Sequence, residues 1–399
     1  MHRSFSTRRA AAAAALSLCC ALATAAPFTP ANDNDVVERP PAGATDPSVR
    51  RVDSLRKQLA ARPDDAALRL EIARRYFDMA MAQGDPRYVG YASAAIIPLA
   101  RTDANNAQYW LLHGLLQQYS HDFAGALQSL EKAGELDPQS PDPIAWRAAI
   151  HMVQARYPQA LSECTRLVPL THPLHAQGCT AYVQASTGHL EAAYQSLGRE
   201  LAAAGAVDPG LVLWVQTRLA EMAIRLQRPD QAQAHFNRAL QLGITDQFLL
   251  GAYADFLLQQ HRPAEVITRL ADWERSDILL LRLALAGRAA KDPRARGWAD
   301  QLRDRFNAAA QRGDRLHEQE AARFELDIED QPAKALELAS RNYTAQKEAR
   351  DAEILLRAAL AAGQPKAAQP ALDWLRVNGY EDPALANLAA QLVAKGATR

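Results

Sequence analysis

His172 and His175 are the residues of this sequence whose type and spacing come nearest to a metal site. They flank Pro173 and Leu174 in the segment THPLH. Zinc needs several converging ligands, and no Cys or Glu accompanies the pair at a metal-site spacing. We therefore expect a solvated loop and no metal at this position, with metal binding by the two histidines as the alternative.

Catalytic signatures are missing from the rest of the chain. The sequence contains no GxSxG, HExxH or GxxxxGK[ST] motif, the patterns of several hydrolases and nucleotide-binding proteins. Its 45 basic residues balance its 45 acidic residues, which argues against a nucleic-acid or anionic-membrane surface. We expect a protein that is not an enzyme, uses no cofactor and does not bind nucleic acid.

The first residues have the features of a bacterial secretory signal peptide. Arg3, Arg8 and Arg9 precede an alanine-rich apolar run, and small residues at 23–25 supply a cleavage site. We expect a signal peptide over 1–26 and export to the periplasm through the general secretory route, with twin-arginine export and a fraying helix as the alternatives. Leu18 is too large for the position before a lipoprotein cysteine, so a lipoprotein is not expected.

The next segment, 27–52, is rich in Pro, Asp and Asn and predicts a disordered linker. Beyond it, no segment approaches the roughly 18 uninterrupted apolar residues of a membrane span, so we expect no span in the mature chain.

The elements that must position any site are best seen in the segment AQYWLLHGLLQQYSHDFAGALQSLEKAGELDP, residues 107–138. A large apolar residue, small residues where two helices approach closely, and a proline that ends the second helix follow one another at fixed spacing. The positions are Trp110, Gly114, Ala126, Leu130, Ala133 and Pro138. Related patterns return with a period near ~34 residues. This segment resembles a tetratricopeptide (TPR) repeat.

The TPR resemblance implies an all-α fold over 53–399. We expect a right-handed superhelical solenoid of about eight to nine TPR-like helical hairpins with a C-terminal capping helix, and an uncertain register in 277–315. The resemblance also implies an inner groove lined by the first helix of each repeat. Such grooves bind peptides, extended segments or folded partner domains, and the family has no common enzymatic activity.

Helical geometry, carried forward from Trp110 and Gly114, predicts which side chains face this groove. Aromatic residues and arginine dominate binding hot spots. The predicted partner-binding residues are Tyr119, Tyr182, Trp214, Arg225, Arg288 and Phe324. Trp214 and Arg225 are about three turns apart on one face, which leaves room for a ligand carboxylate or carbonyl at Arg225. The alternative for each aromatic residue is burial between neighbouring helices.

A second candidate site is the irregular segment GDPRYVGYA, residues 84–92, which we expect to be an insertion before the second helix of the first repeat. Arg87, Tyr88 and Tyr91 follow a Gly-Asp-Pro turn signal, and the two tyrosines would share a helix face. They form either an aromatic clamp for a partner or a packing corner against the first repeat.

Cys164 and Cys179 are the two cysteines left after removal of the leader. They fall on neighbouring helices of the expected third and fourth repeats, so an oxidising compartment permits a disulfide between them. Two buried thiols are the alternative.

The sequence thus predicts a non-enzymatic periplasmic scaffold that binds a protein or peptide partner in the concave groove, with an envelope or inner-membrane protein as a candidate partner. The alternative is a periplasmic accessory protein for small-solute or metal handling, motivated by the histidines.

Overall fold

The computed structural model describes residues 47–397. The predicted signal peptide and most of the predicted linker lie outside these residues. The chain divides into two compact units, Met1–Asp53 and Ser54–Arg399, and α2 (Pro47–Ala61) begins in the first. The following paragraphs concern the described part of the second unit.

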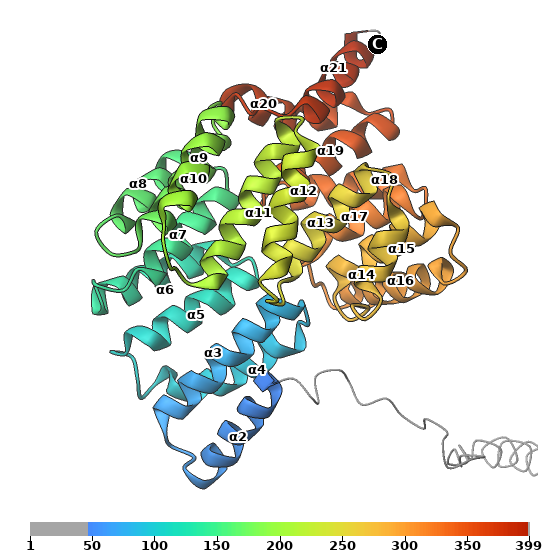
Figure 1. The fold of residues 1–399 in the computed structure, drawn as a ribbon. Helices are drawn as coiled ribbons and strands as arrows, with labels where there is room; N and C mark the ends of the chain where they lie inside the picture. Colours follow the sequence, from blue (N-terminus) through green and yellow to red (C-terminus); the bar gives the residue numbers. More distant parts are fainter. Residues whose placement is uncertain (1–46, 398–399) are drawn as a thin grey trace, which may run out of the picture. The chain divides into compact units, whose positions relative to one another are not determined.

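Helical hairpins follow one another along this unit, and the described residues form no strand (Figure 1). The first five pairs are α3 (Ala66–Gln83) with α4 (Arg87–Ile96), α5 (Ala107–Tyr119) with α6 (Phe123–Leu136), α7 (Asp142–Val153) with α8 (Tyr157–Leu167), α9 (Pro173–Ala185) with α10 (Leu190–Ala203), and α11 (Pro209–Arg225) with α12 (Pro229–Gln241).

The remaining pairs are α13 (Gln247–Gln259) with α14 (Pro263–Leu270), α15 (Asp277–Ala290) with α16 (Ala295–Gln311), α17 (Glu318–Asp327) with α18 (Pro332–Asn342), and α19 (Ala349–Ala361) with η3 (Pro365–Ala368) and α20 (Gln369–Asn378). Helix α21 (Pro383–Ala397) follows the last pair. After α2, the described residues therefore form nine hairpins and a final helix, in agreement with the expected all-α solenoid.

Small residues let the two helices of a hairpin approach each other. A Cβ atom on Gly114 of α5 would lie 2.9 Å from Cγ of Leu130 on α6, which is closer than side chains pack. Ala126 on α6 is fully buried at the same crossing. The sequence pattern around Trp110 thus marks a real close contact between two helices.

The sequence predicted that segment 84–92 is an insertion ahead of the second helix. The structure shows no insertion there. Gly84 ends α3 with a φ of +68°, a conformation that glycine adopts without strain. Pro86 then precedes α4, which begins at Arg87, so most of the segment is the second helix itself. A short 3₁₀ helix, η2 (Ile97–Ala100), completes the hairpin.

Hairpins far apart in the sequence also touch. The indole Nε1 of Trp374 donates to the hydroxyl of Tyr157 at 3.1 Å, which joins α20 to α8. The amide of Gln247 on α13 donates to the carbonyl of Met81 on α3 at 3.1 Å. The C-terminal segment, red in Figure 1, reaches the turn between α9 and α10 at Gly188. The solenoid therefore folds back on itself, and its own helices occupy part of its inner side.

A disulfide joins Cys164 on α8 to Cys179 on α9, with 5.5 Å between the two Cα atoms. It links the third hairpin to the fourth. Cys164 is fully buried and Cys179 is half-buried.

We expect the Cys164→Ser, Cys179→Ser double variant to lose about 3 kcal/mol of unfolding free energy, because a bond that closes a loop of this length restricts the unfolded chain. Urea titration followed by circular dichroism measures the loss. Reductant should destabilise the wild-type chain equally and leave the double variant unchanged. Equal midpoints for the oxidised wild-type chain and the double variant would contradict the prediction.

Candidate functional site

A pocket of about 200 Å³ lies among the first helices of three consecutive hairpins, α7, α9 and α11. Apolar and aromatic side chains make up most of its wall, and one arginine and one glutamate line it with them. The residues are Ala145, Ala148, Ala149, Met152, Val153, Leu167, His175, Cys179, Tyr182, Trp214, Arg218 and Glu348. We call it the inner pocket.

Local sequence fixes the two helices that carry the aromatic wall. His172 caps α9, because its Nδ1 accepts a hydrogen bond from the amide of Leu174 at 3.1 Å. Asp208 caps α11 in the same way, with Oδ1 2.8 Å from the amide of Gly210. Proline stands at the start of both helices, where its missing N–H costs nothing.

Gly178 explains how Trp214 fits between the helices. A Cβ atom on Gly178 would lie 2.3 Å from Cζ3 of Trp214, so the indole ring of α11 packs directly on the backbone of α9. The ring also meets His175 edge to face, with 6.2 Å between centroids. This close packing holds the indole in place at the pocket wall.

Arg218 is one helical turn beyond Trp214 and brings a positive charge to the pocket. Its guanidinium lies over the ring of Tyr182, 4.8 Å from the centroid, and pairs with Glu221 at 2.9 Å. Its Nε is buried and has no hydrogen-bond acceptor among the described residues. Burial raises the pKa of Tyr182.

Glu348 reaches the pocket from the segment before α19. Its carboxylate forms a capping box with Asp351 and accepts a hydrogen bond from Arg350 at 2.7 Å. The neighbouring amide of Lys347 donates to the carbonyl of Val153 on α7 at 2.7 Å, which fixes the segment against the pocket.

A ladder of opposite charges crosses the first helices of the C-terminal hairpins. Asp255 on α13 accepts hydrogen bonds from Arg282 on α15 and Arg323 on α17, each at 2.7 Å. Burial raises the pKa of Asp255, but the two guanidinium groups outweigh this effect and lower it overall. Asp327 and Arg357 continue the ladder to α19. The charges pair with one another, although Nε of Arg323 has no hydrogen-bond acceptor among the described residues, so the ladder is a structural feature of the C-terminal hairpins.

Of the predicted groove residues, the structure brings Tyr182 and Trp214 together in the inner pocket. Their contact with a partner stays a prediction. Tyr119 is half-buried at the end of α5 and is not part of this pocket. Burial, together with nearby acidic groups that include Asp277, raises the pKa of Tyr119 to about 12.

Phe324 was wrongly expected in the groove. It is fully buried in the core and meets Phe306 of α16 edge to face, with 5.5 Å between ring centroids. The groove-facing positions were predicted by carrying the helical register forward through α16. This helix has 17 residues and is longer than the second helix of a regular repeat, so the predicted positions beyond it no longer face the groove. A side chain without exposed surface cannot contact a partner.

The sequence predicted that Arg225 binds a carboxylate or carbonyl of a ligand. In the structure, carbonyl groups of the chain itself take this place. The guanidinium donates to the carbonyls of Ala185 at 2.6 Å and Glu381 at 2.9 Å, and it stacks on Tyr380. Arg288 likewise donates to the carbonyl of Ile328, at the end of α17. In this structure both arginines therefore tie hairpins together, while Arg288 remains exposed; their contact with a partner stays a prediction.

The tyrosines of the 84–92 segment pack against the first repeat, which was the second of the two alternatives. The rings of Tyr88 and Tyr91 lie 6.0 Å and 5.2 Å from the ring of Tyr76 on α3, measured between centroids. Arg87 pairs with Asp85. Tyr91 keeps 51% of its surface exposed, so it alone of these aromatic rings offers a large outer face.

Sequence reasoning missed Arg218 and Glu348. Arg218 had a usable signal, because it follows Trp214 by four residues and so shares its helix face. Glu348 had no such signal in the sequence, because only the fold brings it to the pocket.

The two histidines singled out at the start have structural partners. His172 caps α9, and Nδ1 of His175 lies 3.1 Å from the hydroxyl of Thr171. Within 47–397, no cluster of three or more His, Cys, Asp or Glu residues is arranged to hold a metal ion. In the same range, no helix has the length and apolar character needed to cross a membrane.

The hairpins and their close contacts define the class of protein as a TPR-like helical solenoid with a small pocket on its first helices. No protein-family model matches the chain, and no curated protein matches it.

Solved structures with similar folds include three helical-repeat proteins. A Rap protein complexed with competence and sporulation factor is 12% identical over 87% of this chain and 99% of its own, with a TM-score of 0.47. PilW, a type IV pilus biogenesis factor, is 16% identical over 61% and 94%, with a TM-score of 0.37. A chain of the APC/C hetero-tetramer Cut9–Hcn1 is 17% identical over 78% of this chain, with a TM-score of 0.40. This chain spans about half of that one (52%). Because each TM-score is below 0.5, the fold assignment rests on the hairpins described above.

Proposed function

We propose that this protein is a non-enzymatic interaction scaffold that binds a segment of a protein partner at the inner pocket. The observation that carries the proposal is the convergence of Met152, Tyr182, Trp214 and Arg218 from three successive first helices on one pocket. Aromatic rings and an arginine around a small apolar hollow are the features of a binding hot spot. A volume of about 200 Å³ is smaller than typical pockets for drug-sized ligands, roughly 300–1,000 Å³, and suits a side chain of a partner.

We further propose that the protein works in the periplasm after removal of its leader, with an envelope or inner-membrane protein as its partner. The arginines and alanine-rich run of the first residues support export. The Cys164–Cys179 disulfide suits an oxidising compartment. The metal-handling alternative has no comparable support, because His172 and His175 both have structural partners.

The test is affinity capture from an envelope fraction with the chain purified after export. We expect Trp214→Ala to reduce capture of the specific partner at least tenfold, a loss typical of a truncated hot-spot aromatic residue. Trp110→Ala is the matched control, because Trp110 is also half-buried but lies outside the pocket and bonds to the carbonyl of Ala104. Equal capture by both variants, at equal thermal stability, would rule out the inner pocket as the binding site.

A further inference from the structure

His121 joins two hairpins that lie far apart in the sequence. It occupies the turn between α5 and α6, and its Nε2 lies 2.7 Å from the side-chain amide nitrogen of Gln346. Gln346 belongs to residues 343–348, the connecting segment between α18 and α19. In the same segment, the backbone amide of Lys347 donates to a carbonyl of α7, and Glu348 lines the inner pocket. Two contacts, one to α7 and one to His121, therefore hold the connecting segment at the pocket.

The contact between His121 and Gln346 requires a neutral imidazole. The amide nitrogen of Gln346 is a donor, so Nε2 of His121 must accept and carry no proton. A protonated imidazole has donors on both ring nitrogens and no acceptor, and two N–H groups would then face each other. The gain of one proton thus turns this contact from an attraction into a repulsion.

The charges around His121 act in the same direction. His317 and Glu320 at the start of α17, and Glu348 and Arg350 beside the start of α19, are the charged groups that face it. Both carboxylates already have cationic partners, because Glu320 lies 3.8 Å from Nδ1 of His317 and Glu348 lies 2.7 Å from the guanidinium of Arg350. Burial, and then the positive charge of His317, lower the pKa of His121. A histidine with a lowered pKa stabilises the closed arrangement at higher pH, and this stabilisation is lost as the pH falls.

The other titratable groups nearby cannot produce the same effect. The carboxylate of Asp122, the next residue, caps α6. Burial would lower the pKa of His317, but Glu320 outweighs burial and raises it, and burial raises the pKa of Asp351 to about 7. A raised pKa favours protonation in the closed arrangement, so any contribution from these two groups opposes that of His121 as the pH falls.

We propose that His121 is a pH-sensitive clasp on the inner pocket. In its neutral form it holds the connecting segment, and with it Glu348, at the pocket wall. Protonation at mildly acid pH loosens the segment and widens access to the pocket. This inference goes beyond the proposed function, because the clasp is measurable without any partner.

The test is hydrogen exchange of the exported chain, followed by mass spectrometry at pH 7.5 and pH 5.5 and corrected for intrinsic exchange rates. Peptides that contain the connecting segment report its release, since the amide of Lys347 is protected only while it is bonded to α7. His121→Gln removes the titration and keeps a polar side chain. Glutamine is tolerated at this position, because Gln227 has a φ of +59° in the turn between α11 and α12, close to the +60° of His121.

The wild-type segment should lose up to about tenfold more protection than the His121→Gln segment between pH 7.5 and pH 5.5, since a released histidine regains its ordinary pKa of about 6.5. His261→Gln is the matched control. His261 is exposed in the turn between α13 and α14 with a φ of +56°, and this variant should behave like the wild-type chain. Gln346→Glu should reverse the sign, because a carboxylate accepts from protonated His121, so protection should rise as the pH falls.

Two outcomes would overturn the inference. One is an equal change of protection in the wild-type chain and the His121→Gln variant. The other is an equal loss of protection in peptides from α15, which would mean that the whole fold opens and not the connecting segment. Neither outcome bears on capture of a partner by Trp214, so the clasp and the proposed function fail independently.

Discussion

A Phe324→Ala variant is expected to lose about 3–5 kcal/mol of unfolding free energy. The side chain is fully buried and packs edge to face on Phe306, so its removal takes apolar surface from the core and leaves a cavity between α16 and α17. Urea titration followed by tryptophan fluorescence measures the loss. The chain has six Trp residues, and Trp298 lies in the same core cluster, so unfolding of this region is visible.

Phe248→Ala is the matched control, because Phe248 is only half-buried near the start of α13. The Phe248→Ala variant should lose clearly less unfolding free energy than the Phe324→Ala variant. A Phe324→Ala variant as stable as the wild-type chain would mean that Phe324 is exposed, and would restore it to the set of groove residues.

Asp255→Ala is expected to cost about 3 kcal/mol of unfolding free energy. Removal of the carboxylate leaves the guanidinium groups of Arg282 and Arg323 without their shared partner, and the side chain of Arg282 is only 7% exposed. An uncompensated charge in a buried position is much more destabilising than the loss of a surface ion pair. Thermal and urea unfolding at neutral pH measure the effect.

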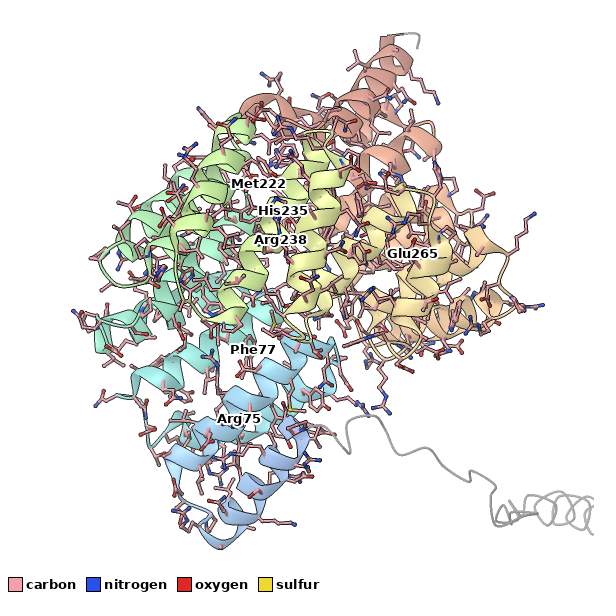
Figure 2. The ribbon with its side chains drawn as sticks, in the orientation of Figure 1. Arg75, Phe77, Met222, His235, Arg238 and Glu265 are labelled. Carbon is pink, nitrogen blue, oxygen red and sulfur yellow. A yellow bond between two sulfur atoms is a disulfide. The ribbon has the colours of Figure 1, made fainter. Side chains whose placement is uncertain are left out.

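Glu265→Ala provides the contrast. Glu265 on α14 pairs with Arg262, and its side chain is 53% exposed (Figure 2). Its removal should cost at most about 1 kcal/mol, as for other surface ion pairs. Equal losses for Asp255→Ala and Glu265→Ala would show that the charge ladder is solvated and contributes little to the fold.

The hairpins could be predicted because their signals are local. Trp110, Gly114 and Ala126 act within a single pair of helices, and the close approach of Gly114 to Leu130 is a direct consequence of their spacing. The disulfide pairing belongs to the same kind of inference, since Cys164 and Cys179 lie on neighbouring helices.

The site was predicted in part. Tyr182 and Trp214 lie in one pocket because both sit on first helices of adjacent repeats, where the register is regular. Phe324 was misplaced because the register was carried across the long helix α16. The partners of Arg225 could not be predicted, because Glu381 and Tyr380 reach it only through the folding back of the C-terminal segment. A contact of this kind depends on the geometry of every hairpin between Arg225 and Glu381.

The fold-back also changes how the groove is understood. An open concave surface would leave Arg225 for a partner, but here the carbonyls of the chain itself use it. Arg225 is thereby used within the chain, and the inner pocket is the hollow at which we propose that a partner binds.

The most direct test of the central claim, binding of a partner at the inner pocket, is site-specific photo-crosslinking in the exported chain. Benzoylphenylalanine would replace Tyr182 in the pocket or, in a second variant, Tyr91, which is 51% exposed on α4. After irradiation of an envelope preparation, we predict a single discrete adduct from position 182 and none from position 91. An adduct from position 91 with none from position 182 would contradict the account and place the binding surface on the first hairpin.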